Sequence, residues 1–272
     1  MPTQAEKAEA FRALHHRDTA FIIPNPWDLG TARVLEQLGF EALATTSAGL
    51  AFSLGKRDTQ VGCVGVLHHA RDMAASVEVP LSADLENGFG DAPEVVAETI
   101  RQSAQTGLVG GSIEDSTGRR DDPIYEESLA VDRIRAAVES ARALAFPFTL
   151  TARSENYLVG RPDLAATIRR LQLYQDAGAD VLYAPGLTSE DDIATLVRSV
   201  DRPVNVLAGL SGTSFTLASL SALGVRRISI GSGLYRAAFG PLLRAAKQMR
   251  EQGTFATIAD EPVTFREISG MY

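Results

Sequence analysis

Charged side chains end three of the apolar segments in this 272-residue chain. Asp84 and Glu86 come at the end of one short apolar run, Glu114 ends a second, and Arg153 ends a third. A buried strand can be apolar on both faces, so charged residues at its last positions lie where the backbone leaves the core. We therefore expect these side chains at strand ends, where they can reach a metal ion or a substrate.

Carboxylates that gather at one place repel each other unless a cation lies among them. An all-oxygen set favours Mg2+ or Mn2+ over zinc. Arg153 would grip a carboxylate or phosphonate of the substrate with its forked guanidinium. The alternative is that Asp84 caps a loop and Glu86 is solvated, which would leave this stretch without a chemical role.

The elements that would position these residues alternate between helix and strand. At Gly39, Gly107, Gly178 and Gly224 a predicted helix ends on glycine and an apolar strand follows. Glycine suits this junction because the residue after a helix often takes a left-handed conformation. Repeated junctions of this kind predict parallel strands joined by crossover helices.

We predict eight strands with helices between them. The predicted strands are 21–24, 42–46, 80–84, 111–114, 148–152, 181–184, 203–207 and 227–230. This count over about 250 residues predicts a (β/α)8 barrel, and a doubly wound open sheet is the alternative. No linker divides the chain, so residues 1–272 are expected to form one domain. The segment 233–272 is longer than the closing of a barrel requires. We expect it to form one long helix and a polar end that pack on a neighbouring subunit.

The composition argues against several classes of partner. The chain has 26 Lys and Arg against 34 Asp and Glu, a net charge of -8, and no long basic cluster, so nucleic acid is not expected as a partner. No apolar run approaches the ~20 residues of a spanning helix, so a membrane partner is not expected either. The single cysteine, Cys63, and an N-terminus unlike a signal peptide indicate a cytoplasmic protein.

In a (β/α)8 barrel the active site lies at the C-terminal ends of the strands. The predicted second strand ends in Thr45, Thr46 and Ser47, whose hydroxyls and amides could hold a carboxylate. The seventh and eighth strands end in turns that contain Gly209 and Gly231, similar to loops that cradle phosphate. Glycine is also common in ordinary turns, so a phosphosugar enzyme remains a weaker alternative.

Four ordered motifs together resemble the isocitrate lyase and phosphoenolpyruvate mutase superfamily. They are residues 45–47 with 54–58, 84–90, 112–115 and 152–155. The resemblance covers most of the chain and implies a (β/α)8 barrel whose eighth helix is exchanged between the subunits of a homo-oligomer, a dimer or tetramer. It also implies Mg2+ and 2-oxo acid or enolate substrates in which a C–C or P–C bond is made or broken.

The resemblance implies a metal site built from acids. Asp84 would bind the ion directly, and Glu86 and Glu114 would bind it through water. Glu86 replaces the aspartate more usual at its place. Asp58 would lie beside the metal shell, and we assign Asp58, Glu114 and Arg153 as candidate catalytic residues.

The resemblance also implies a pocket for a small carboxylate substrate. The residues that the resemblance places against this substrate are Thr45, Thr46, Ser47, Trp27 and Arg153. The first three would act largely through main-chain amides. Trp27 would form a wall of the pocket without a catalytic role. From its place on the predicted seventh strand, Asn205 is added as a residue that could supply a hydrogen bond.

Two segments differ from well-known members of the superfamily. The lyases carry a Lys-Arg-Cys-Gly-His type motif after strand four, whose cysteine donates a proton, but residues 116–123 contain no cysteine. The Lys-Thr-Asn-Ser type loop of the mutases is also missing. The sixth strand ends at Tyr183 and Pro185, where relatives place a glutamate or histidine. We expect Cys63 to be a structural thiol and the four histidines to lie on outer helices.

We interpret the chain as a Mg2+-dependent enzyme that acts on a small 2-oxo acid or a 2-hydroxy di- or tricarboxylate through an enolate. It would be a C–C lyase, decarboxylase or hydrolase, with its proton supplied by the loop after strand four, by water or by Tyr183. Two alternatives stay open. One is a mutase or hydrolase of the phosphonopyruvate or carboxyphosphonate type, and the other is a non-catalytic relative that binds dicarboxylates.

Overall fold

The computed structural model describes residues 2–259 and 262–272. Its eight parallel strands form one sheet in the order β1, β8, β7, β6, β5, β4, β3, β2. The strands are β1 (Phe21–Ile23), β2 (Leu43–Ala44), β3 (Leu81–Asp84), β4 (Gly110–Glu114), β5 (Thr149–Arg153), β6 (Val181–Tyr183), β7 (Val204–Leu207) and β8 (Arg227–Ser229). All eight predicted strands are confirmed.

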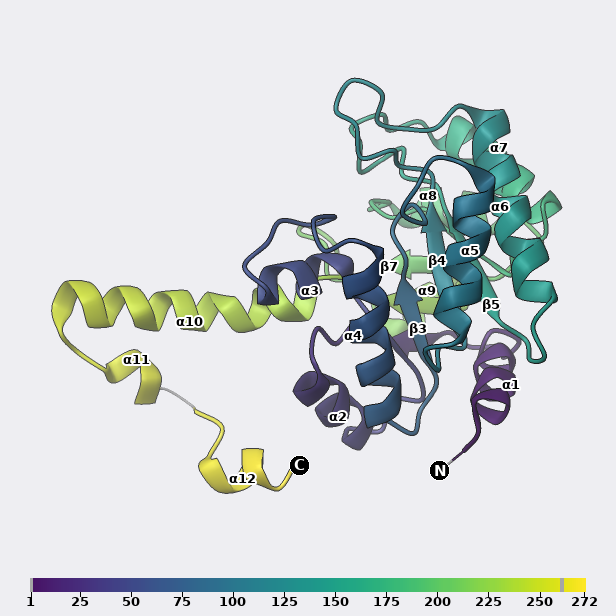
Figure 1. Cartoon of the computed structure of the whole chain (residues 1–272). Helices are drawn as coiled ribbons and strands as arrows, with labels where there is room; N and C mark the ends of the chain where they lie inside the picture. The colour runs from purple at the N-terminus through teal and green to yellow at the C-terminus, as the bar shows by residue number, and fades with distance from the viewer. Residues whose placement is uncertain (1, 260–261) are drawn as a thin grey trace.

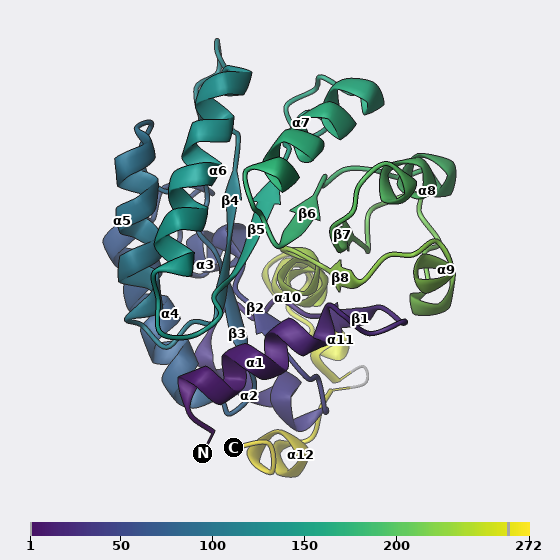
Figure 2. The ribbon, with the colours of Figure 1, turned by 90° about the vertical axis from the view of Figure 1, so that its right-hand side faces the viewer.

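Helices connect the strands and surround them, which makes the fold the predicted (β/α)8 barrel (Figures 1 and 2). They are α1 (Gln4–Leu14), α2 (Leu29–Gln37), α3 (Ser47–Ser53), α4 (Cys63–Ser76), α5 (Pro93–Ala104), α6 (Glu127–Arg142), α7 (Leu164–Asp176), α8 (Glu190–Arg198) and α9 (Leu217–Ala222). Polar caps fix several starts: the side chains of Asp28, Asp163 and Ser189 each accept a backbone N–H from the first turn. Within the described residues, no helix has the length and apolar character to cross a membrane.

The Asn25 side chain links the ends of three strands at the break in the sheet between β1 and β2. Its amide nitrogen donates to the carbonyl oxygens of Ala44 and Thr45, both at 3.1 Å. Its amide oxygen accepts the N–H groups of Ile230 and Gly231, both at 2.8 Å. One buried side chain therefore joins the C-terminal ends of β1, β2 and β8, the end at which the site was predicted.

Five polar or charged residues form a row across neighbouring strands. Glu114 of β4 is paired in register with Arg153, Arg153 with Tyr183, Tyr183 with Asn205, and Asn205 with Arg227 of β8. Tyr183, Asn205 and Arg227 are buried. Because buried polar groups require partners, this row must be satisfied by its own members or by a bound molecule.

Helix α1 packs at the N-terminal end of the barrel (Figure 2). Its Phe11 joins a buried cluster with Ile23 and Val109. His15 is also buried, with its ring edge-on to the rings of Phe11 and Phe21, and burial lowers its pKa to about 3. His15 is therefore a neutral packing residue.

The C-terminal segment leaves the barrel. Helix α10 (Gly233–Gln252) extends away from it, and α11 (Ala256–Ala259) and α12 (Phe265–Ser269) lead back toward α2 (Figure 1). Tyr272 ends beside Gly30 of α2. The predicted long helix is confirmed, but the predicted polar end is wrong, because two short helices there expose large apolar side chains such as Phe255 and Phe265.

We predict that Asn25→Ala lowers the free energy of unfolding by about 2 kcal/mol or more, because the Ile230 and Gly231 amides lose their acceptor. Urea unfolding followed by circular dichroism measures the change. Gln102→Ala, which removes an amide from the exposed face of α5, should change it by less than about 0.5 kcal/mol. Equal stability of the two variants would contradict this role for Asn25.

Candidate active site

A cavity of ≈ 160 Å³ lies at the C-terminal ends of the strands. Seven of the predicted site residues line it: Thr45, Thr46, Ser47, Asp58, Asp84, Arg153 and Asn205. A larger cavity, of ≈ 580 Å³, lies at the opposite end of the barrel beside α1, and its lining includes His15 and Phe148. We take the smaller cavity as the candidate site because it contains the predicted acids and lies at the end where barrel enzymes work.

Arg153, the last residue of β5, makes ion pairs with three carboxylates. Its nitrogens lie 3.1 Å from Asp84 Oδ1, 3.1 Å from Glu114 Oε2 and 2.9 Å from Glu155 Oε1. Burial alone would lower the pKa of Arg153, but the three carboxylates raise it well above its usual value. We predicted a metal ion as the cation among the acids. The structure shows that the Arg153 guanidinium also places a positive charge among them.

Asp84 is positioned by the ends of two neighbouring strands. Its backbone N–H donates to the Thr45 hydroxyl at 3.0 Å, and its Oδ1 accepts the backbone N–H of Glu86 at 3.1 Å. Thr45 was predicted to hold substrate, but its hydroxyl oxygen is used here to orient the backbone of the metal-ligand candidate. The carboxylate of Asp84 still faces the cavity beside Arg153.

Glu86 is buried in a left-handed backbone conformation, with φ at 51°. Its Oε1 is a buried oxygen without a hydrogen-bond partner in the described residues. Burial, followed by the charges of Asp84 and Asp58, raises the pKa of Glu86 to about 7, while Arg153 acts in the opposite direction. A strained residue that holds an unpaired carboxylate fits a site for a divalent cation.

Asp58 and the start of α3 form another wall of the cavity. Burial and the charge of Asp84 raise the pKa of Asp58, and a hydrogen bond from the Ser47 side chain acts against this rise. Thr46 caps α3 by accepting the N–H of Gly49 at 3.2 Å. The cap uses the amide of Gly49 and leaves those of Ser47 and Ala48 for the predicted carboxylate site.

Three predicted site residues do not line the cavity: Glu86, Glu114 and Trp27. Glu114 is turned to Arg153, and burial raises its pKa well above the usual value. Trp27 differs from its predicted place as a pocket wall because its indole packs edge-on against Tyr235 of α10, with ring centroids 5.3 Å apart. Within the described residues, no three acidic, histidine or cysteine side chains come close enough to bind one metal ion together, so the metal ligands stay a prediction.

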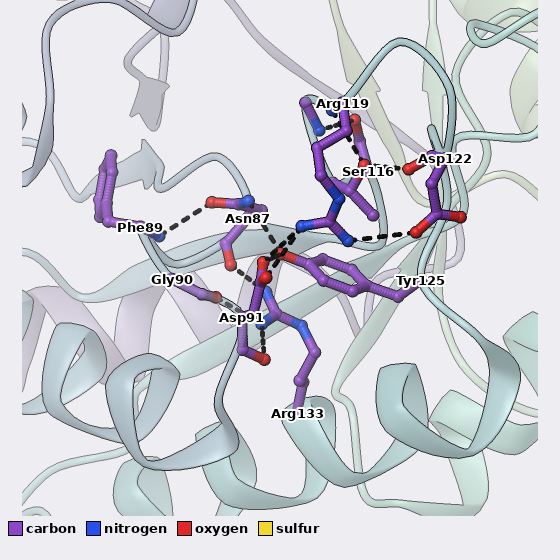
Figure 3. Close-up of polar contacts among 11 residues, drawn as sticks. Asn87, Phe89, Gly90, Asp91, Ser116, Arg119, Asp122, Tyr125 and Arg133 are labelled. Carbon is purple, nitrogen blue, oxygen red and sulfur yellow. Dashed lines mark hydrogen bonds and ion pairs between the residues drawn. The ribbon is translucent and has the colours of Figure 1, made fainter.

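A second arginine holds the loop that follows Glu86 (Figure 3). Arg133 of α6 is almost fully buried and donates to the carbonyl oxygens of Asn87, Gly90 and Asp91. Its guanidinium lies 3.9 Å from the centre of the Tyr125 ring, and the Tyr125 hydroxyl donates to Asp91 Oδ1 at 2.6 Å. This support explains how the strained loop keeps its shape.

The same network reaches the loop after β4. Arg119 in that loop forms an ion pair with Asp91 at 2.8 Å and another with Asp122 at 3.3 Å (Figure 3). The side chains of Arg119, Asp91 and Asp122 are exposed, so this connection is weaker than the one made by Arg133. The loop of residues 116–123 is thus tied to the loop that carries Glu86.

Sequence reasoning missed Arg227 as a residue of the cavity. Arg227 and Ser229 line the cavity, while Ile228 between them belongs to the hydrophobic core. The sequence does contain a signal for this placement, because polar and apolar residues alternate in Arg227, Ile228, Ser229 and Ile230. Residues two apart on a strand share a face. That pattern predicts a strand with one polar face, and polar residues on the inner face of a barrel can reach its cavity.

Known proteins similar to this chain match it over most of its length. The sequence profile of the phosphoenolpyruvate phosphomutase family matches residues 11–250. A 2-methylisocitrate lyase of Salmonella typhimurium is 30% identical, with 96% of this chain and 90% of that protein covered. A crystal structure from Burkholderia cenocepacia, provisionally named a lyase/mutase, is 60% identical over 98% of this chain and 95% of its own, with a TM-score of 0.95. An oxaloacetate acetylhydrolase bound to its product oxalate is 25% identical over 100% and 95%, with a TM-score of 0.87.

We predict that Glu86→Gln removes part of the pH dependence of stability in the metal-free protein. The folded pKa of about 7 exceeds the usual 4.5, so the folded state holds this proton more tightly and wild-type stability falls as pH rises from 4.5 through 7. Between pH 5 and pH 8, the free energy of unfolding of the wild type should therefore fall by up to about 3 kcal/mol more than that of Glu86→Gln. Urea unfolding with EDTA at several pH values measures this difference. Glu98→Gln, at an exposed carboxylate of α5, is the control, and parallel curves for Glu86→Gln and wild type would refute the assignment.

Proposed function

Because the chain belongs to the phosphoenolpyruvate phosphomutase family of the isocitrate lyase and phosphoenolpyruvate mutase superfamily, we propose that it is a Mg2+-dependent enzyme. Its substrate would be a small 2-oxo acid, or a 2-hydroxy acid that yields one, and the reaction would pass through an enolate. We assign it to the carbon–carbon cleaving members, as a lyase, decarboxylase or hydrolase. A phosphonopyruvate hydrolase of the same fold is known in complex with oxalate and Mg2+.

One observation carries the proposal: Asp58, Asp84 and Arg153 line a single cavity with the N-terminal turn of α3. The carboxylates supply ligands for a hard cation, and the amides and the arginine supply donors for an anion. A 2-oxo acid needs both, because its carboxylate is negative and its oxo group gains charge as an enolate forms.

The residues present fit Mg2+, with Asp84 as the direct ligand and Glu86 and Glu114 acting through water. The buried Glu86 oxygen without a partner is the observation that supports this fit. When bound, the ion would stabilise the negative charge of an enolate oxygen. Mn2+ would serve the same ligands, which are all oxygens.

The chain's own residues would bind and orient the substrate. The amides of Ser47 and Ala48 and the guanidinium of Arg153 would hold its carboxylate. Tyr183 lies beneath Arg153, with 5.3 Å between the guanidinium carbon and the ring centre, and burial raises the pKa of this phenol to about 12. The phenol therefore stays protonated at neutral pH and can donate a hydrogen bond to a developing oxyanion.

The loop after β4 favours a reaction other than that of the cysteine-dependent lyases. Residues 116–123 contain no cysteine, and the chain's single cysteine, Cys63, lies in α4, where burial raises its pKa and keeps it a thiol. A proton, where the reaction needs one, would come from water, from the loop or from Tyr183. Decarboxylation or hydrolysis of an oxaloacetate-like diacid meets this constraint most directly.

We predict turnover of one member of a panel of oxaloacetate, 2,3-dimethylmalate, 2-methylisocitrate and phosphonopyruvate, and only with Mg2+ or Mn2+. Asp84→Ala should lower kcat/KM by about 100-fold or more, because the substrate oxygens lose the bound cation. Product analysis by NMR identifies the bond that is broken.

Asp132→Asn is the matched control, since Asp132 is an exposed carboxylate of α6 paired only with Arg135 among the described residues. It should keep wild-type turnover. Undiminished activity in Asp84→Ala would refute the metal site. Binding of Mg2+ and oxalate without turnover of any substrate would instead identify a non-catalytic dicarboxylate-binding relative.

We also propose that α10 packs on a second copy of the chain. The helix extends away from its own barrel (Figure 1), and it exposes Phe239, Leu242, Leu243 and Met249. Apolar side chains gathered on a projecting helix are typical of an interface between subunits. Helix exchange between two copies would cover them.

We expect the wild-type protein to elute as a dimer or tetramer in size-exclusion chromatography with light scattering. The double variant Leu242→Asp with Leu243→Asp should shift it to monomer, because the charges cannot be buried without partners. Arg250→Ala, at an exposed position of the same helix, should keep the oligomer. A monomeric wild type would refute the proposed exchange.

A further inference from the structure

Arg227 is a buried arginine held in a fixed orientation at the start of β8. Its side-chain Nε donates to Asn205 Oδ1 at 2.9 Å, and the amide nitrogen of Asn205 donates to the Ser229 hydroxyl at 2.9 Å. The Ser229 hydroxyl lies 3.5 Å from that of Tyr183. The guanidinium is therefore part of a continuous polar network on the inner face of β6, β7 and β8.

Among the arginines that are buried or partly buried, Arg227 has no carboxylate or main-chain carbonyl partner in the described residues, because its acceptor is the side-chain amide oxygen of Asn205. Arg153 pairs with three carboxylates, Arg170 with Asp115, and Arg133 donates to three carbonyl oxygens. Within the described residues, the Arg227 side chain makes one hydrogen bond, to Asn205, and no carboxylate lies within ion-pair distance of it.

The free nitrogens of Arg227 belong to the cavity. Arg227 is 6% exposed and lines the cavity together with Tyr183, Asn205 and Ser229. Its terminal nitrogens make no hydrogen bond within the described residues, so they are free to bind a molecule in the cavity that Arg227 lines. Burial lowers the pKa of Arg227 to about 10, which still leaves the group charged at neutral pH.

A buried charge without a counterion is costly, and a bound anion would remove that cost. The two ends of the cavity also differ in charge. Asp58 and Asp84 lie with Arg153 at one end, whereas Arg227 stands three strands from Arg153 in the register row, separated from it by Tyr183 and Asn205. A ligand with an anionic group at each end would match this arrangement.

We propose that Arg227, oriented by Asn205 and Ser229, forms a second carboxylate subsite that binds the distal carboxylate of a 2-oxo diacid. The inference rests on the proposed function for the first carboxylate, which would lie by Arg153 and α3. It narrows the substrate to 2-oxo acids with a second carboxylate, because a monoacid would leave the Arg227 charge uncompensated. Arg227 is thus a residue that determines specificity.

The test compares two ligands by isothermal titration calorimetry with Mg2+ present. Oxalate occupies only the first subsite, whereas 3,3-difluorooxaloacetate adds a distal carboxylate. Arg227→Met should weaken binding of difluorooxaloacetate by about 10-fold or more, the effect of losing a charge-assisted hydrogen bond, and change oxalate binding by less than about twofold.

Arg226→Met is the matched control, because the neighbouring Arg226 points outward and donates to the Asp18 carbonyl oxygen. It should bind both ligands like the wild type. Equal losses for both ligands in Arg227→Met would show a structural role and overturn the inference, as would unchanged affinity for the diacid.

A second binding measurement, on the wild-type protein, tests the subsite even where Arg227→Met does not fold. The wild type should bind the monoamide of difluorooxaloacetate, with the distal carboxylate replaced, about 10-fold more weakly than the diacid itself. Equal affinity would overturn the subsite. Absence of Mg2+-dependent oxalate binding in the wild type would instead refute the proposed function, so the two failures can be told apart.

Discussion

The ion pairs of Arg153 are the interaction on which the rest of the site depends. Three carboxylates, from Asp84, Glu114 and Glu155, meet one guanidinium at the C-terminal end of β5. Without that cation the acids could not all remain charged in a buried place, and the strands that carry them would be pushed apart. The arginine thus allows β3, β4 and β5 to bring their acids to one point, and it leaves Asp84 facing the cavity.

Around this centre the barrel interior is polar where most barrels are packed with branched apolar residues. The row from Glu114 to Arg227 crosses five strands, and its members satisfy one another through the bonds of Tyr183, Asn205 and Ser229. Such networks rigidify a core when they are complete. Here the bonds among Tyr183, Asn205, Ser229 and Arg227 leave the terminal nitrogens of Arg227 without a hydrogen bond in the described residues.

The loops above the barrel are held by a different device. Arg133 binds three carbonyl oxygens of the loop after β3, and Tyr125 covers it from above. This buried support maintains Glu86 in its left-handed conformation, which an isolated loop would abandon. The exposed pairs of Arg119 add only a weak connection to the loop after β4.

The sequence by itself determined the eight strands, the barrel and seven residues of the cavity, because glycine junctions, apolar runs and strand-end charges are local signals. It also indicated the family, through four motifs in order. Only the tertiary structure decided that Arg153 lies among the acids, that Trp27 packs on Tyr235, and that Arg227 opens into the cavity. These facts depend on side-chain directions and on contacts between strands far apart in the chain, and the spacing of residues along one chain does not contain them.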